Sequence, residues 1–130
     1  GEAGGVKGAA VTGEDVVVFS SGGVSEVSFR DARIRLRGEF ACVRRDPSGE
    51  LRGFSLAGAS RLEDGLLLAE SSSSVDWLDV AYGGDVVRVA CEGADSGLRV
   101  AALGRRMVAV NGGTPRPLDP GAEFFSPFAE

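Results

Sequence analysis

Three arginines alternate with apolar residues in the segment ARIRLR, at positions 33, 35 and 37. Alternate side chains of an extended strand share one face, so Arg33, Arg35 and Arg37 would project together at intervals of roughly 6.6–6.8 Å. Guanidinium groups bind carboxylate and sulfate through paired hydrogen bonds. The row therefore predicts a ligand-binding surface for an acidic sugar chain or, as the competing interpretation, ion pairs with Asp or Glu on a neighbouring strand.

Trp77 and Tyr82 are the other two candidate ligand-binding residues. Their rings are suited to stacking on sugar rings. Trp77, however, has the strand parity of Val75, and Tyr82 has that of Val80. This parity favours a position in the core for both aromatic side chains.

Catalytic constellations are scarce in this chain. It contains no histidine, which excludes Ser-His-Asp and Cys-His arrangements within it. It also lacks a G-x-S-x-G elbow, a P-loop and a G-x-G-x-x-G motif. Nineteen acidic residues leave open a small carboxylate-dependent hydrolase, because a glycosidase needs only two carboxylates. Most of these acids stand at turns, however, which favours solvated positions.

No cofactor and no metal are expected. Two cysteines and no histidine cannot assemble a four-ligand Cys/His zinc site. Asp76, Asp79 and Asp85 offer oxygen ligands for calcium, but their spacing matches no known calcium loop. For Cys42 and Cys91 the sequence leaves open both a disulfide and two separate thiols.

Composition narrows the class of protein further. The 130 residues carry a formal net charge of −5, which argues against nucleic acid as a partner. No apolar window is long enough for a membrane span. We expect a flexible lead-in over residues 1–14, a single domain over 15–120 and a tail over 121–130.

Short apolar runs recur between turn signals every 8–12 residues, which is typical of an all-β sandwich or barrel. Hairpins are indicated at Asp46–Gly49, at Asp64-Gly65 and at Gly83-Gly84, and the serine run 71–74 is expected to be a loop. No helical periodicity is found. The sequence predicts an antiparallel β-sandwich of about ten short strands, with a closed β-barrel as the alternative.

The segment MVAVNGG predicts a tight hairpin. Asn111 and Gly112 suit the two central positions of a type I′ turn, where both residues need positive φ. In that register Val108 and Val110 face the core, while Met107 and Ala109 face outward.

Two stretches carry a resemblance to a known family: FACVRRDPSGELRGFSLAGASRLEDG, and some forty residues later MVAVNGGTPRPL. They combine a strand with a basic end, an Asp-x-x-Gly turn, an apolar strand, a G-x-x-x-L passage and a late V-x-V-N-G hairpin. Together, over roughly residues 24–118, they resemble the C-terminal β-sandwich region of heparinase II/III-like polysaccharide lyases and related carbohydrate-active enzymes.

The resemblance implies a non-catalytic accessory domain of a bacterial polysaccharide-degrading enzyme, located in the periplasm or secreted. In such enzymes the catalytic residues belong mainly to a helical toroid, so no catalytic residue is carried over and this chain alone is not expected to be an enzyme. The implied partners are a neighbouring catalytic domain and an anionic polysaccharide. The alternative is a self-standing β-sandwich for protein interaction or cell-surface structure.

Overall fold

The computed structural model describes residues 6–12, 15–20, 24–29, 32–48, 50–93 and 97–127, and in that part of the chain every regular element is a strand. No helix there is long and apolar enough to cross a membrane. The strands are β1 (Val6–Thr12), β2 (Asp15–Ser20), β3 (Val24–Phe29), β4 (Ala32–Arg45), β5 (Leu51–Asp64), β6 (Leu67–Gly83), β7 (Val86–Glu92), β8 (Arg99–Ala101), β9 (Met107–Val110), β10 (Arg116–Pro117) and β11 (Phe124–Phe125).

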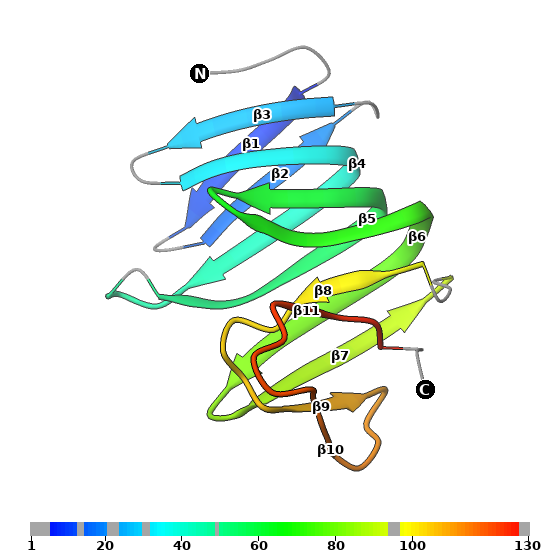
Figure 1. Ribbon diagram of the computed structural model, residues 1–130. Coiled ribbons are helices and arrows are strands. Elements are labelled where there is room, and N and C mark those ends of the chain that lie inside the picture. The colour runs from blue at the N-terminus through cyan, green and yellow to red at the C-terminus, as the bar shows by residue number, and fades with distance from the viewer. Residues whose placement is uncertain are drawn as a thin grey trace.

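All these strands belong to one hydrogen-bonded sheet that folds over on itself into two layers (Figure 1). The front layer holds β3, β8, β11 and one half of each of the long strands β4, β5 and β6. The rear layer holds β1, β2, β7, β9, β10 and the other halves. The all-β sandwich predicted from the sequence is confirmed. The path from β1 to β10 does not close into a barrel.

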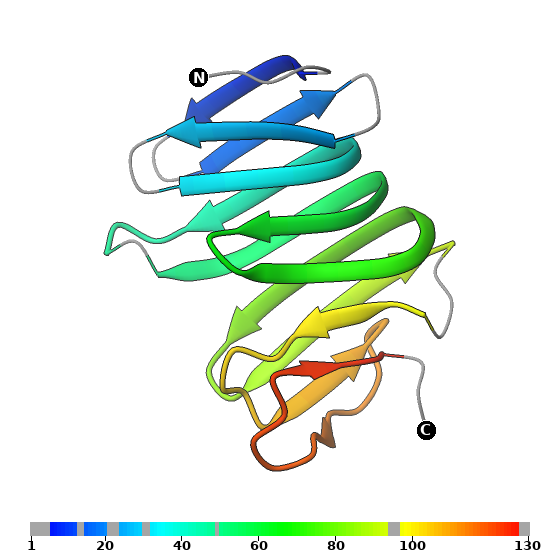
Figure 2. The same ribbon diagram turned by 45° about the horizontal axis from the view of Figure 1, so that its top comes forward.

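Two details of the prediction were wrong. The sheet is mixed, because β7 and β9 pair in parallel, and three of its strands are 14, 14 and 17 residues long. The turn-like residues within β4, β5 and β6 produce bends rather than breaks, so each apolar segment continues into the next. Figure 2 shows these three strands curling from one layer into the other.

Two glycines stand at the bend where β4 pairs with β5. Gly38 has a φ of 146°, and a Cβ atom there would lie 2.3 Å from the Cα atom of Ala59. Gly58, with a φ of 57°, precedes the fully buried Ala59. Only glycine combines this backbone conformation with so close an approach, so Gly38 allows the two strands to turn the corner together.

The serine run does not form a loop between strands. Ser71–Ser74 lies inside β6 at the bend, where β5 advances from Ala59 to Arg61 while β6 advances from Glu70 to Val75. The extra residues of β6 form a wide bulge that lets the strand follow the bend. Residues 72–74 are exposed, which suits their small polar side chains.

The core lies between the layers and is built from the inward-facing residues of both. Its largest completely buried side chains include Phe54, Ile34, Leu36, Leu62 and Leu78. Burial of a side chain of this size contributes about 1.5–3 kcal/mol. The inner faces of the strands therefore supply the main stabilisation, and both outer faces remain available for other chemistry.

The hairpin expected after β9 has the predicted turn but a shifted register. Asn111 and Gly112 have φ values of 50° and 75°, and the Gly113 amide donates to the Val110 carbonyl at 2.9 Å. Beyond the turn, Arg116 pairs with Val108, which is one residue out of step with a two-residue hairpin.

Burial in β9 also departs from strict alternation. Val108 is buried as predicted, but Val110 is only half-buried. Ala109, expected on the outer face, is buried as well. Side chains on both faces of β9 are therefore buried at its centre. The alternation of apolar and polar residues along one strand cannot predict burial on both faces.

The segments expected as a flexible lead-in and a tail each contain one described strand. Strand β1 falls inside the expected lead-in, where it pairs with β2. Strand β11 falls inside the expected tail, where it pairs with β8. Regular pairing thus begins before residue 15 and continues beyond residue 120.

Candidate functional site

The arginine row lies where the sequence places it, on the outer face of the front layer. Ile34 and Leu36 are buried, whereas Arg33, Arg35 and Arg37 are exposed. The alternation of β4 therefore separates a core side from a charged side.

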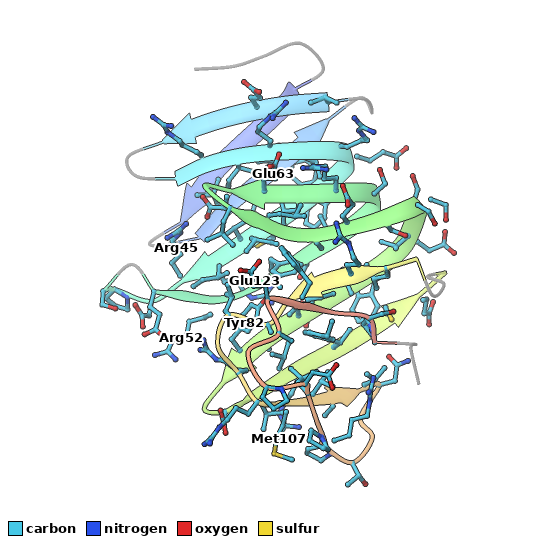
Figure 3. All side chains as sticks on the ribbon, in the orientation of Figure 1. Arg45, Arg52, Glu63, Tyr82, Met107 and Glu123 are labelled. Carbon is cyan, nitrogen blue, oxygen red and sulfur yellow. The ribbon has the colours of Figure 1, made fainter. Side chains whose placement is uncertain are left out.

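Arg35 is held between two carboxylates. Its Nε lies 2.8 Å from Oε1 of Glu26 on β3, and its Nη1 lies 3.6 Å from Oε2 of Glu63 on β5. Figure 3 labels Glu63 on this face. The competing interpretation of the row, cross-strand ion pairing, is thus confirmed for Arg35.

The ion pairs continue across the front layer. Arg61 contacts both Glu63 and Glu70, and Arg99 of β8 donates to Glu70 at 2.6 Å. The hydrogen bond from Arg99, together with the charge of Arg61, holds the pKa of the Glu70 carboxyl below its usual range. The result is a chain of alternating charges running from β3 to β8, which we call the ion-pair mesh.

Arg33 and Arg37 stand outside the mesh. Among the described residues, no carboxylate oxygen lies within 4 Å of either guanidinium group. Two shallow hollows flank Arg35: one of about 380 Å³ is lined in part by Arg33, and one of about 230 Å³ is lined in part by Arg37. Each hollow is therefore lined by arginine and glutamate side chains of the mesh and by one arginine from outside it.

Trp77 and Tyr82 lie on opposite sides of their layer. Tyr82 is 2% exposed, and its hydroxyl donates to the Ala101 carbonyl at 2.7 Å. Burial raises the pKa of this phenol. The core position expected for Tyr82 is confirmed, and its candidacy as a surface ligand-binding residue is wrong because the ring does not reach the surface.

Trp77 is 43% exposed on the outer face of the rear layer. The parity argument that favoured a core position was wrong, because Val75 and Leu78 are both buried and two exposed residues separate them. That local irregularity turns the indole outward. Trp77 and the arginine row are thus on different faces and do not form one site.

The exposed ring of Trp77 has aromatic neighbours that sequence reasoning missed. Cross-strand pairing places Phe19, Phe40, Ala57 and Trp77 side by side on four adjacent strands of the rear layer. The rings of Phe19 and Phe40 are 5.2 Å apart between centroids. We call these four residues the aromatic row. Strand parity in EFACVRR would have indicated that Phe40 faces outward. The register between strands, which aligns Phe40 with the other three residues, cannot be read from the sequence.

A polar cluster lies beside the aromatic row on the same strands, with Ser55 two residues from Ala57 along β5 and Asp79 two residues from Trp77 along β6. Arg44 donates to Ser55 Oγ at 2.8 Å and to Asp79 Oδ1 at 3.0 Å, and the hydroxyl of Ser55 donates to the same carboxylate oxygen. The side chains of Arg44 and Asp79 remain 31% and 37% exposed. This polar cluster is therefore pre-ordered and still reachable from solvent.

The remaining candidates do not converge. Asp79 belongs to the polar cluster, Asp85 pairs with Arg106, and Asp76 lies beside Gly93, so the three aspartates considered for calcium do not group. In the described part of the chain, no three His, Cys, Asp or Glu side chains group as a metal site would require.

The two cysteines are not joined by a disulfide. Cys91 is buried, and burial raises the pKa of its thiol. Cys42 is half-buried and lies on β4, three strands away from β7 in the sheet. That separation amounts to about 14 Å by strand spacing, which is far beyond disulfide reach.

The chain matches no protein-family model, no curated protein and no solved structure.

Proposed function

We propose that this chain is a non-catalytic accessory β-sandwich domain of a heparinase II/III-like, polysaccharide-degrading enzyme, and that the outer face of its front layer contacts an anionic polysaccharide. Arg33 and Arg37 carry the proposal. Both project from β4, and no described carboxylate neutralises either one.

The charge of the front face supports an acidic ligand. The arginine row and the ion-pair mesh together hold five arginines and three glutamates, a charge of +2 on a protein whose formal charge is −5. The arginines are Arg33, Arg35, Arg37, Arg61 and Arg99, and the glutamates are Glu26, Glu63 and Glu70. The mesh holds Arg35 in place between Arg33 and Arg37, which form no ion pair with a described carboxylate, so a ligand meets a partly ordered surface.

The proposal that catalysis belongs to another domain is supported by the buried phenol of Tyr82 and by the lack of histidine in this chain. A lyase needs a base that reaches its substrate, and Tyr82 donates its proton to a backbone carbonyl inside the core. Chemistry is therefore assigned to a neighbouring domain. A helical domain of several hundred residues in the same reading frame would support this part of the proposal.

Binding to immobilised heparin tests the front face. The variant Arg33→Ser/Arg37→Ser should elute at clearly lower salt and bind about tenfold more weakly, because two guanidinium contacts are lost. The matched control is Arg52→Ser/Arg106→Ser, which changes net charge equally but removes arginines paired with Asp46 and Asp85. Equal weakening of both variants would show that net charge alone governs retention and would refute the site.

A further inference from the structure

The outer face of the rear layer carries exposed aromatic rings in a line. Phe19 is 51% exposed and Trp77 is 43% exposed, with Phe40 and Ala57 half-buried between them. Neighbouring strands lie about 4.8 Å apart, so the aromatic row spans about 14 Å across β2, β4, β5 and β6. Isolated apolar residues are common on protein surfaces, but this alignment across four strands calls for an occupant.

The side chains of the aromatic row differ in size. The Cβ of Ala57 is the whole of its side chain, and this residue sits between the rings of Phe40 and Trp77 in the cross-strand register. A small residue between two large ones leaves room for a ligand ring to lie between them. The row therefore favours a partner made of separate rings over a continuous flat surface.

Polar groups beside the row also limit the partner. The cluster of Arg44, Ser55 and Asp79 adjoins Ala57 and Trp77, and Asp79 Oδ2 takes part in none of its hydrogen bonds. A flat apolar partner would remove water from this half-exposed pair without replacing its hydrogen bonds, which is costly. A pyranose ring has an apolar C–H face and a hydroxyl edge, so it can meet the row and the cluster together.

The charges at the Trp77 end argue against an acidic ligand. Glu92 is the cross-strand partner of Trp77, and Asp76 precedes it. Both are exposed. A polyanion would be repelled here, in contrast to the front face, where no described carboxylate neutralises Arg33 or Arg37.

We infer that the aromatic row and the adjoining polar cluster bind an uncharged oligosaccharide, with sugar rings stacked on Phe40 and Trp77 and hydroxyl groups bonded to Asp79 and Arg44. This inference extends the proposed function to a second surface and rests on it only for the general class of ligand. The two faces then take sugars of different charge.

Trp77 makes the test direct, because it is the only tryptophan in the chain. Its fluorescence is followed during titration with cellohexaose, xylohexaose and mannohexaose, each up to millimolar concentration. At least one should give a saturable change in emission. Phe40→Ala should weaken that binding about tenfold, while Leu66→Ala, which truncates an exposed leucine outside the row, should leave it unchanged.

Trp77→Ala provides the second measurement. By calorimetry it should lose binding of the neutral hexasaccharide, keep its retention on heparin and keep the thermal unfolding midpoint of the parent within a few degrees. The Arg33→Ser/Arg37→Ser variant should show the reverse pattern, so failure of the inference and failure of the proposed function are distinguishable.

Two results would overturn the inference. One is the absence of any emission change with all three hexasaccharides. The other is an emission shift that depends on protein concentration and accompanies self-association in sedimentation, because a second copy of the chain would then be the occupant of the row.

Discussion

The outer faces of the two layers differ in chemistry although the strands β4, β5 and β6 run through both layers. Over the front layer the side chains are mainly arginine and glutamate, joined in the ion-pair mesh. Over the rear layer they include the aromatic row and a compact polar cluster. The front face is suited to charge, and the rear face is suited to rings.

The change of chemistry occurs at the bend. Strand β4 presents Arg35 and Arg37 outward before Gly38, and Phe40 and Cys42 outward after it. The register shift at Gly38 moves the outward positions from odd to even numbers. A single strand can therefore contribute residues to two chemically different surfaces, provided that the bend at Gly38 keeps its conformation.

The largest expected effect comes from disturbing that corner. Gly38→Ala would place a Cβ atom 2.3 Å from the Cα of Ala59 and force a φ of 146° on alanine. We expect a loss of about 3 kcal/mol or more in the free energy of unfolding, from overpacking and backbone strain together. Urea unfolding midpoints measure this loss.

Gly65→Ala is the matched control, because Gly65 also has a positive φ, of 74°, but open space around its Cβ direction. It should cost only about 1 kcal/mol. Similar midpoints for the two variants would mean that close packing at the bend does not maintain the separation of the two faces.

A smaller effect is expected where the layers are tied together at one end. Arg45, on the rear half of β4, forms an ion pair with Asp64 at the end of β5 in the front layer, and Asp64 is only 6% exposed. Figure 3 labels Arg45. Arg45→Leu should cost about 3 kcal/mol, because it leaves a buried carboxylate without its cation.

Arg52→Leu makes the same substitution at an exposed pair with Asp46 and should cost about 1 kcal/mol at most. The two variants are compared by thermal and urea unfolding. A cost for Arg45→Leu no greater than that of Arg52→Leu would show that the pair between the layers matters no more than the exposed pairs.

The smallest effect concerns the protonation of the mesh. Since the pKa of Glu70 is lowered in the folded protein, its contribution to stability is complete above the ordinary glutamate pKa of about 4.3. That contribution is lost as the pH falls through the lower folded-state value. The difference in urea midpoint between the parent and Glu70→Gln should therefore shrink between pH 6 and pH 3. A difference independent of pH would exclude this linkage.

Local patterns in the sequence predicted the features that local geometry decides. Alternation predicted the outward arginines and inward apolar residues of β4. Asn111-Gly112 predicted the positive φ values of its turn, and the turns at Asp46 and Asp64-Gly65 lie between strands as expected. The inward parity of the sequence changes between Phe29 and Ala32, which predicts a turn or bulge at Arg30-Asp31. These two residues lie outside the part of the chain that the structure describes.

The pairing between distant strands could not be predicted from the sequence. The aromatic row depends on the registers of β2, β4, β5 and β6 simultaneously, and each bulge shifts the parity of every later position in its strand. The carboxylates opposite Arg35 come from β3 and β5 for the same reason. Strand parity favoured a core position for Trp77 because it was counted across an irregularity that no turn residue marks.

The parallel pairing of β9 with β7 has a consequence for the order of folding. From β4 to β7 each strand pairs with its successor through a short hairpin, so these contacts can form one after another at low entropic cost. Strand β9 pairs with β7 only after the chain has passed through β8 in the other layer. We therefore expect the hairpin-linked strands to form first during folding and β9 and β10 to dock last. The backbone amides of β9 and β10 should then be the least protected from hydrogen exchange.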